Sequence, residues 1–445
     1  MKISVLGLGK LGAPLAAVFA SKGYTVIGTD VNPAAVAAIN AGRAPVDEPG
    51  LQGLIDQSRS RLSATDDPIA AVSGTDATFI IVPTPSDASG RFSNDYALGA
   101  LATVGQALQR KSGYHLVVMT STVMPGSMDG ELRATLERNA GRTLGPSLGF
   151  CYNPEFIALG TVVRDMLRPD MILIGESDAQ AGDMLERVYH QSCDNTPAIR
   201  RMNFVNAELT KISVNTFVTT KISYANMLAD ICDRLPGADV DVVTHAVGAD
   251  SRVGAKYLKG ATGYGGPCFP RDNVALAALA RSLGANPDLA ESTDRVNQYQ
   301  IERVLGAVQA RVQAKGTVGI LGLSYKPATA VIEESQGVAL AERLLDEGHP
   351  VVGFDPKAMS AADAKLRGRM RLASSAEECV RSADIAVVMT PWPEFGTMSA
   401  DAFAKPGSRM PVIDCWRVLP ADSVRAVADL LYVGQGGLSV PAGIL

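Results

Sequence analysis

The chain has 445 residues, of which 47% are hydrophobic and 20% charged, and this length is too great for one ordinary hydrophobic core, so two or three domains are expected. The formal net charge of −5, from 41 basic and 46 acidic side chains, argues against a general nucleic-acid surface. No apolar run has transmembrane length and no signal-peptide pattern is present, which predicts a cytoplasmic protein without a membrane partner.

The N-terminal residues predict a β-α-β unit that binds a dinucleotide. Its parts are a strand at 2–6, the glycines Gly7, Gly9 and Gly12, a helix at 13–21 and a strand at 24–29. The glycines permit a tight turn, close approach of a pyrophosphate and close helix packing. Asp30, after the second strand, would accept hydrogen bonds from ribose hydroxyls and repel a 2′-phosphate, which favours NAD over NADP. A purely structural β-α turn is the alternative.

Later strands extend this unit into a parallel sheet with helices on both faces. The strands expected at 77–82 and 115–120 both lead into polar turns that contain proline. Ligands gather at the carboxyl ends of such strands, so Thr84, Ser121 and Thr122 are candidates for the nicotinamide side of the site. Ordinary turn chemistry is the alternative for each of them alone.

A long helix is expected at 204–233, where the sequence contains neither glycine nor proline and where its length suits a connection between domains. Lys211 and Asn215 share one face of this helix because they are four residues apart. The helix is otherwise mostly small and apolar, so we expect Lys211 to point into an enclosed site rather than into solvent. The same apolar character suits a two-fold dimer. Glu155 follows another apolar segment, and a solvated surface glutamate is its default interpretation.

The least ordinary stretch is 263–272, Gly-Tyr-Gly-Gly-Pro-Cys-Phe-Pro-Arg-Asp. Its three glycines and two prolines rule out a regular helix, argue against an ordinary strand and bring bare backbone close to some other group. Cys268 would be an accessible thiol near Arg271; a small buried hydrophobe is the alternative. Asp272 would also cap the helical pattern that covers 272–313. The other cysteines and the histidines show no metal-ligand spacing, so no metal site is expected.

The C-terminal third repeats the order of the first. Residues 317–323, 351–356 and 382–391 resemble 2–8, 26–30 and 74–83. They predict a second Rossmann-like sheet, which has Ser324-Tyr325-Lys326-Pro327 in place of the full glycine fingerprint and would bind a nucleotide differently. The Gly-rich tail after about 433 is expected to be loosely held. The expected fold class is therefore α/β, with two doubly wound parallel-sheet domains joined by a long central helix and a helical domain, at 1–200, 201–312 and 313–445.

Taken together, these segments resemble the UDP-glucose/GDP-mannose dehydrogenase family over roughly residues 1–420. The matching motifs are Gly7–Gly12, Ser121-Thr122-Val123, Asn153-Pro154-Glu155-Phe156, Glu208–Lys211 with Asn215, Gly263–Gly266 with Cys268 and Asp272, Val296-Asn297 with Gln300, Lys326, and Thr390–Phe395. The resemblance implies a four-electron oxidation of a sugar C6 alcohol to a carboxylate with two NAD⁺. It also implies that Cys268 captures the aldehyde as a thiohemiacetal, which becomes a thioester that water releases.

The resemblance also implies roles for individual residues. Lys211 and Asp272 would handle protons and stabilise oxyanions, Asn215 would hold the oxyanion, and Glu155 and Thr122 would position or activate water. The implied cofactor contacts are Gly7, Gly9, Leu11, Gly12, Asp30, Pro83, Thr84, Thr122, Glu155 and Arg271. The implied substrate contacts are Phe156, Lys211, Asn215, Tyr257, Leu258, Lys259, Tyr264, Gly265, Lys326 and, across a homodimer interface, Arg252.

Several positions depart from the family pattern: Leu159, Pro267, Arg271, Met227 and Glu333. They suggest a divergent subgroup, while Cys268, Lys211, Asn215 and Asp272 are all present. UDP-glucose is the first guess for the substrate, with GDP-mannose and a UDP-N-acetylhexosamine as rivals. A two-electron hydroxyacid or polyol dehydrogenase, and a catalytically silent nucleotide-sugar or NAD-binding regulator, are the alternatives from other classes.

Overall fold

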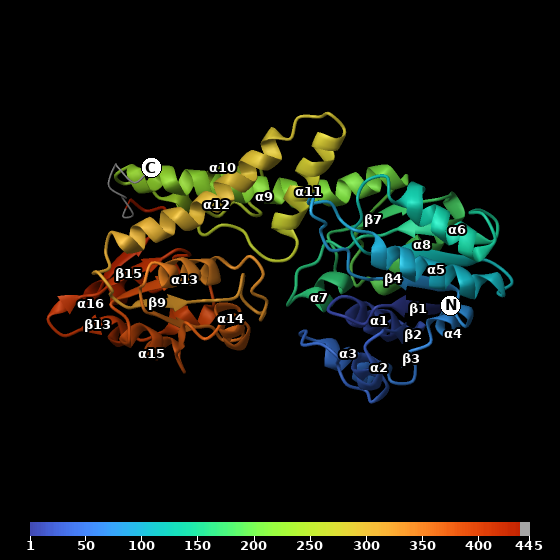
Figure 1. Cartoon of the computed structure of the whole chain (residues 1–445), viewed down its shortest axis with the longest axis horizontal. Helices are drawn as coiled ribbons and strands as arrows, with labels where there is room; N and C mark the ends of the chain where they lie inside the picture. Colours follow the sequence, from blue (N-terminus) through green and yellow to red (C-terminus); the bar gives the residue numbers. More distant parts are fainter. Residues whose placement is uncertain (437–445) are drawn as a thin grey trace. The chain divides into compact units, whose positions relative to one another are not determined.

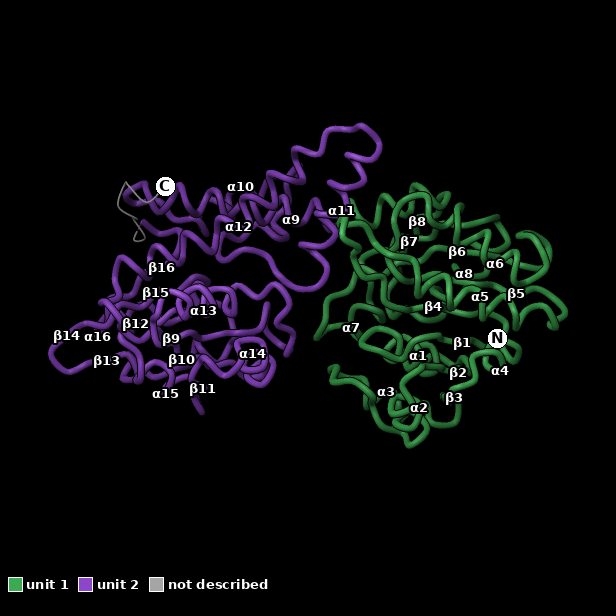
Figure 2. The backbone as a smooth tube through the Cα atoms, in the orientation of Figure 1, with its two compact units in different colours: residues 1–213 green, residues 214–445 purple. Residues whose placement is uncertain are grey.

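The computed structural model describes residues 1–436, and the chain divides into two compact units, Met1–Ser213 and Val214–Leu445 (Figure 2). Helix α9, Phe204–Arg234, runs through the division between them, as the sequence predicted for 204–233. Each unit contains its own sheet, mostly parallel in unit 1 and all-parallel in unit 2, and the predicted α/β fold class with two Rossmann-like sheets is confirmed. The finer division at 1–200, 201–312 and 313–445 stays a prediction.

Unit 1 is built on an eight-stranded sheet with the order β3-β2-β1-β4-β5-β6-β7-β8 (Figure 1). Its strands are β1 Lys2–Leu6, β2 Thr25–Thr29, β3 Leu62–Thr65, β4 Ala77–Ile80, β5 His115–Met119, β6 Leu148–Tyr152, β7 Met171–Glu176 and β8 Ala198–Met202. The order of the first six strands is that of a dinucleotide-binding Rossmann sheet, and only β6 and β7 pair antiparallel. The switch in strand order lies between β1 and β4, where such sheets bind their ligands.

Helices cover both faces of this sheet because successive strand side chains point to opposite sides. Ile3 and Val5 of β1 belong to a buried cluster with α1, α3, α7 and α8. Leu6 belongs to a second buried cluster with α5 and α6. The helices of unit 1 before α9 are α1 Gly12–Ser21, α2 Pro33–Asn40, α3 Leu51–Ser58, α4 Pro68–Ser73, α5 Asp95–Gln109, α6 Arg133–Ala140, α7 Val162–Leu167 and α8 Ala179–Ser192.

Unit 2 carries a six-stranded, all-parallel sheet with the order β11-β10-β9-β12-β15-β16, which is again the Rossmann order. Its strands are β9 Val318–Leu321, β10 Val351–Phe354, β11 Arg371–Leu372, β12 Ile385–Val388, β15 Pro411–Asp414 and β16 Asp429–Tyr432. The helices of unit 2 after α9 are α10 Val240–Ala249, α11 Phe269–Ser282, α12 Asp288–Gln309, α13 Gln336–Asp346, α14 Met359–Leu366, α15 Ala376–Arg381 and α16 Ala421–Val427.

The predicted internal repeat extends to the glycines. Gly7 and Gly322 have φ of +100° and +99°, and each donates its N–H to the last residue of the neighbouring strand at 2.8 Å. A Cβ at Gly12 would overlap the carbonyl oxygen of Gly7, and a Cβ at Gly337 would overlap that of Gly322. The second sheet therefore keeps the first and last glycine of the fingerprint, but the loop 323–335 separates them and hides the pattern in the sequence.

Two predicted boundaries were wrong. The helical pattern expected at 272–313 is two helices, α11 and α12, and α11 begins earlier, at Phe269 inside the glycine-rich segment. Pro270 lies in the first turn of α11, where its missing N–H costs nothing.

The C-terminal tail is attached at its beginning, since the N–H of Gly434 donates to Asp233 Oδ1 at 2.8 Å. Residues 437–445, on which the rest of the tail prediction falls, lie outside the described residues.

Candidate active site

The turn after β1 has the shape of a dinucleotide cradle, and each glycine has a separate reason. Gly7 needs its positive φ and has no room for a Cβ beside Ile81, whereas Gly12 allows α1 to pack closely on the turn. Gly9 is exposed, and a Cβ there would meet nothing within 4 Å. Bare backbone at the N-terminus of α1 therefore faces open space, which fits a pyrophosphate.

Asp30 lies beside this turn at the end of β2. Its Oδ2 accepts from the N–H of Leu8 at 2.6 Å, and its Oδ1 accepts from the N–H of Asn32 at 2.7 Å. Asp30 is only partly buried, so its carboxylate keeps lone pairs that ribose hydroxyls can reach. The geometry of this turn fits NAD.

The turns after β4 and β5 hold each other. Thr84 Oγ1 donates to the carbonyl of Thr122 at 2.8 Å, and Ser121 Oγ bonds both the N–H and the carbonyl of Val82. Thr84 and Ser121 are buried, whereas Thr122 is half-buried and Pro83 is exposed. Thr84 and Ser121 therefore have structural roles, as the alternative of ordinary turn chemistry stated. We still predict that the side chain of Thr122 contacts a ligand.

The corresponding aspartate of the second sheet is not accessible. Asp355 is 1% exposed, and its Oδ2 accepts from the N–H of Leu323, from Ser324 and from the indole N–H of Trp392 at 2.8–3.1 Å. Its Oδ1 accepts from the N–H groups of Lys357 and Ala358. A ribose would find no open oxygen at this position, which agrees with the expectation that the second sheet binds a nucleotide differently.

Lys211 is enclosed, as its apolar helix predicted, and is 6% exposed. Its Nζ donates to the main-chain carbonyl of Glu155 at 2.7 Å and lies 4.7 Å from the centre of the Phe156 ring. The Asn-Pro-Glu-Phe motif and the first turns of α9 therefore meet within unit 1. The carbonyl and the aromatic face both favour the charged ammonium, which is a hydrogen-bond donor only.

Glu155 is not the solvated surface glutamate of the default interpretation. The residue as a whole is half-buried, but its Oε1 is fully enclosed without a hydrogen-bond partner and faces a small cavity lined by α1 and α8 residues, including Phe19, Tyr189 and Ser192. Burial raises the pKa of Glu155 from 4.5 to about 7, and the positive charge of Lys211 offsets part of the increase. The main-chain carbonyl of Glu155 thus accepts a hydrogen bond from Lys211, while its carboxyl group lies in the interior.

We expect the Glu155→Gln substitution to stabilise the protein at pH 8 and to change little near pH 5. The folded protein keeps the Glu155 proton up to about pH 7, whereas an unfolded chain loses it near 4.5, so the glutamate's contribution to stability falls as pH rises through this window. Glutamine removes the need to ionise, which adds about 2–3 kcal/mol to the free energy of unfolding above the window. Denaturant titrations at the two pH values, with exposed Glu394→Gln as control, measure this; equal effects at both would contradict it.

Glu208 is a site residue whose position the sequence motif contained but whose contacts it did not reveal. It is fully buried one turn before Lys211 on α9, and its two oxygens accept from the N–H groups of Gly126 and Met128 at 2.7 Å. Burial raises its pKa to about 7, against these two hydrogen bonds. Glu208 fastens the turn after β5, which contains Ser121 and Thr122, to the helix that carries Lys211.

Cys268 is exposed, so the buried-hydrophobe alternative is wrong. It occupies the N-cap position of α11 but makes no side-chain cap, and its carbonyl accepts from the N–H of Asp272 at 2.8 Å. The positive end of the helix dipole favours a thiolate there. Asp272 is therefore inside the first turn and not the N-cap that the sequence predicted, because the helix starts three residues before it.

Asp272 and Asn215 are brought together within unit 2. The Asp272 side chain is 1% exposed, and its Oδ2 accepts from Asn215 Nδ2 at 2.6 Å. Arg271 Nε lies 3.8 Å from Asp272 Oδ1. The thiol, the carboxylate and the amide thus come from one helix N-terminus and the neighbouring part of α9, which supports the predicted grouping of Cys268, Asp272 and Asn215.

The glycines before Cys268 make room for the loop that replaces the second fingerprint. A Cβ at Gly265 would overlap the carbonyl oxygen of Glu334, and one at Gly266 would collide with the ring of Tyr325. The N–H of Gly266 donates to the carbonyl of Glu333 at 2.9 Å. The loop 323–335 therefore supports the segment that presents the thiol, and Glu333 contributes its main chain to this contact.

The predicted substrate residues of unit 2 fall into two groups. Leu258 and Tyr264 are buried, and the Tyr264 hydroxyl donates to Asp294 at 2.7 Å. Tyr257, Lys259 and Arg252 are exposed, and Arg252 is paired with Asp250. Lys326 is half-buried, with Nζ 5.8 Å from the centre of the Tyr325 ring. Their contacts with a substrate stay predictions.

Residues 1–436 contain neither a metal-binding cluster nor a membrane-spanning helix. No group of three or more His, Cys, Asp or Glu side chains among them is arranged to hold a metal ion. None of the helices in that range is long and apolar enough to cross a membrane.

Models of one protein family match three successive parts of the chain. The NAD binding domain of the UDP-glucose/GDP-mannose dehydrogenase family matches residues 1–193, its central domain matches 205–299, and its UDP binding domain matches 319–421. These three matches cover most of the chain.

Individual proteins are similar along nearly the whole length. UDP-glucose 6-dehydrogenase AglM of Haloferax volcanii is 37% identical over 94% of this chain and 97% of its own. GDP-mannose 6-dehydrogenase of Pseudomonas aeruginosa is 33% identical over 87% of this chain and 91% of its own. The solved structure of a UDP-glucose dehydrogenase from Pyrobaculum islandicum has a TM-score of 0.88 and 33% identity, and covers 98% of this chain and 97% of its own.

Proposed function

Because the chain belongs to the UDP-glucose/GDP-mannose dehydrogenase family, we propose that it oxidises the C6 alcohol of a nucleotide sugar to a carboxylate through a covalent intermediate on Cys268. The family and the enzyme class are confirmed: the chain is an NAD-dependent oxidoreductase of the nucleotide-sugar 6-dehydrogenase family. The single observation that carries the proposal is the exposed Cys268 at the N-terminus of α11 beside the Asp272–Asn215 pair.

The proposed chemistry balances as one alcohol, two NAD⁺ and one water giving one carboxylic acid, two NADH and two protons. NAD⁺ supplies the hydride acceptor for both oxidations. After the first, Cys268 Sγ would bond to the aldehyde carbon and give a thiohemiacetal. The second oxidation leaves a thioester, and water breaks its C–S bond and returns the thiol.

The other residues would hold or move protons around the reacting carbon. Lys211 Nζ would donate a hydrogen bond or a proton to the C6 oxygen and so stabilise the oxyanion. Asn215 would help to hold this oxyanion. Asp272 would take the thiol proton. Thr122 would position or activate the water, and Glu155 would act through its main-chain carbonyl, which holds Lys211 Nζ, because its carboxyl lies in the interior.

The remaining contacts are proposed in the same way. The cofactor would be held at Gly7, Gly9, Leu11, Gly12, Asp30, Pro83, Thr84, Thr122, Glu155 and Arg271. The substrate would be held at Phe156, Arg252, Tyr257, Leu258, Lys259, Tyr264, Gly265 and Lys326. UDP-glucose is our first candidate, since AglM and the Pyrobaculum protein carry that substrate in their names. GDP-mannose and a UDP-N-acetylhexosamine are its rivals.

Counting NADH per sugar tests the function. We expect the chain to form two NADH for each molecule of UDP-glucose, GDP-mannose or UDP-N-acetylhexosamine that it consumes, because both oxidations occur at one carbon before release. Absorbance of NADH and chromatography of the sugar product measure this ratio. One NADH per sugar would support the two-electron alcohol dehydrogenase instead, and no turnover with any of these sugars would favour the silent regulator.

We also propose that the chain forms a homodimer through α9. Four side chains on this helix are 42–66% exposed and recur at helical spacing, namely Phe217, Tyr224, Met227 and Ile231. A stripe of this kind on a long helix marks a protein interface, and a second copy would cover it. Sedimentation velocity at micromolar concentration tests this, and a monomer would contradict it. A cytoplasmic location likewise stays a prediction.

A further inference from the structure

Residues 257–264, which we call the substrate segment, have no regular secondary structure, yet their main-chain groups are held by side chains. Asn226 of α9 accepts from the N–H of Ala261 at 2.7 Å and donates to the carbonyl of Thr262 at 3.0 Å. Asn297 of α12 accepts from the N–H of Tyr264 at 2.6 Å and donates to its carbonyl at 3.0 Å. Each side-chain amide thus makes the main-chain hydrogen bonds that a neighbouring strand would make, and both amides come from helices of unit 2.

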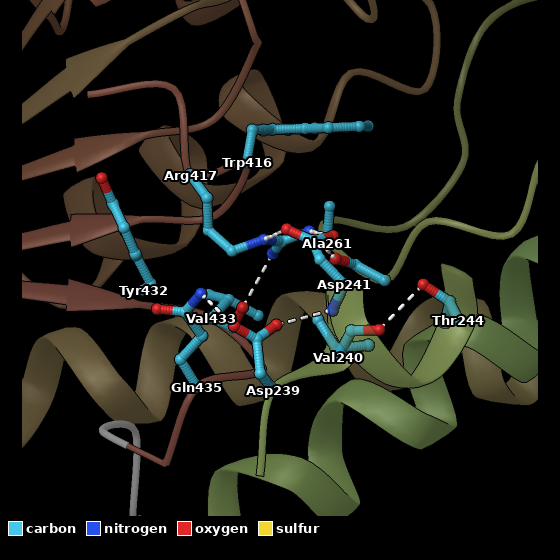
Figure 3. A network of polar contacts seen from close by, with 12 residues as sticks. Asp239, Val240, Asp241, Thr244, Ala261, Trp416, Arg417, Tyr432, Val433 and Gln435 are labelled. Carbon is cyan, nitrogen blue, oxygen red and sulfur yellow. Dashed lines mark hydrogen bonds and ion pairs between the residues drawn. The ribbon is translucent and has the colours of Figure 1, made fainter. Parts of the chain in front are cut away.

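Arg417 holds the same segment from the C-terminal sheet. Its side chain extends from the turn after β15 toward Asp241 of α10 (Figure 3). Nε and Nη2 donate to the two oxygens of Asp241 at 2.6 and 2.8 Å, and Nη2 also donates to the carbonyl of Gly260 at 2.8 Å. Nη1 donates to the carbonyls of Val433 at 2.7 Å and Cys415 at 3.3 Å.

These five hydrogen bonds use all five N–H groups of the guanidinium, and the Arg417 side chain is only 4% exposed. No donor remains for a phosphate or a sugar, so Arg417 is a positioning residue rather than a ligand contact. Its place in the chain decides what it positions. It lies in the part that matches the UDP binding domain, residues 319–421, and Gly260 lies in the substrate segment, eight residues before Cys268.

The turn that carries Arg417 is itself held in place. Arg417 has a φ of +57°, a left-handed conformation that is unfavourable for a residue with a side chain. The buried carboxylate of Asp414 accepts from the N–H groups of Trp416, Arg417 and Leu419 at 2.8–2.9 Å and stabilises this conformation. The direction of the guanidinium is therefore determined by the end of β15.

We infer that Arg417, clamped by Asp241, sets the distance between the nucleotide-binding sheet and the substrate segment, and so places the sugar of a bound nucleotide sugar relative to Cys268. The inference rests on the proposed function. In this inference, the hydrogen bonds of Arg417 to Asp241 and Gly260 determine how well the nucleotide and the sugar are bound together, although Arg417 contacts neither of them. The contribution is geometric, and a lysine cannot reproduce it because a single ammonium cannot reach the carboxylate and both carbonyls in a fixed plane.

Three variants test this inference: Arg417→Lys, Asp241→Asn and the control Arg409→Lys. Arg409 also pairs with an aspartate, Asp429, and donates to main-chain carbonyls such as that of Ala428, but these partners lie far from the substrate segment in sequence. Asp241→Asn removes the negative charge that faces Arg417 but keeps an acceptor oxygen for the guanidinium, so it is the milder of the two variants and tests the inference even if Arg417→Lys should fold poorly. The measurements are kcat/KM for the nucleotide sugar, KM for NAD⁺, and Kd for the matching free nucleoside diphosphate.

We expect Arg417→Lys to lower kcat/KM for the nucleotide sugar by about tenfold or more and Asp241→Asn by about threefold. The Kd of the free nucleoside diphosphate and the KM for NAD⁺ should change by less than about threefold, and Arg409→Lys should match the unchanged chain. An unaltered kcat/KM in Arg417→Lys and Asp241→Asn, or an equal loss of nucleoside diphosphate binding, would overturn the inference. If the unchanged chain oxidises no nucleotide sugar, the proposed function fails, and the ratio of Kd values for UDP-glucose and UDP tests the inference by binding alone.

Discussion

The Cys268→Ala variant is expected to form no sugar acid, with turnover reduced on the order of 10⁴-fold or more, because alanine has no thiol to carry the thioester. Binding of the nucleotide sugar and of NAD⁺ should change by less than about threefold, since the thiol is exposed and makes no side-chain cap of α11. Acid formation is measured by chromatography and binding by calorimetry.

Cys193→Ala is the matched control, because Cys193 is a half-buried thiol in unit 1 that has no proposed role. Cys268→Ser adds a second comparison. An alkoxide is a poorer leaving group than a thiolate, so the serine variant should also fail to release acid at the ordinary rate. Normal acid yield from Cys268→Ala would rule out the thioester mechanism, and an unchanged rate of NADH formation in Cys268→Ser with one NADH per substrate would favour the two-electron alternative.

The Lys211→Met variant is expected to lose about 10²–10³-fold in kcat, because the buried ammonium would no longer stabilise or protonate the C6 oxygen. The KM for NAD⁺ should stay nearly constant, since Lys211 contacts the carbonyl of Glu155 and the ring of Phe156 rather than the glycine turn. A steady-state pH profile separates a chemical role from a structural one. Loss of a proton-handling group removes one limb of the kcat profile.

Lys221→Met is the control for this experiment. Lys221 lies on the same helix, α9, and its Nζ also donates to main-chain carbonyls, those of Val253 and Gly254. Its substitution tests the loss of such a contact without the loss of a proposed proton donor. A similar decrease in kcat for both variants would show that Lys211 acts through the packing of the helix, which contradicts its proposed role.

Local patterns in the sequence were sufficient for the architecture. The strand at 2–6, the glycines with Asp30, the repeat at 317–391 and the uninterrupted helix at 204–233 all correspond to elements of the structure. Such features depend on neighbouring residues: side-chain alternation, backbone freedom at glycine and the absence of helix breakers. The start of α11 was misplaced because Pro270, which usually stops a helix, is tolerated in its first turn.

What only the tertiary structure decided is how residues distant in the sequence serve one another. By itself the sequence determined two nucleotide-binding sheets, an accessible thiol and an enclosed lysine. It did not reveal that Glu208 fastens the turn after β5, that Asp355 is closed off by Trp392, or that Arg417 holds Gly260. These contacts satisfy buried donors and acceptors across large separations along the chain. No local pattern records which distant main-chain group a buried side chain will find, because folding alone brings the two together.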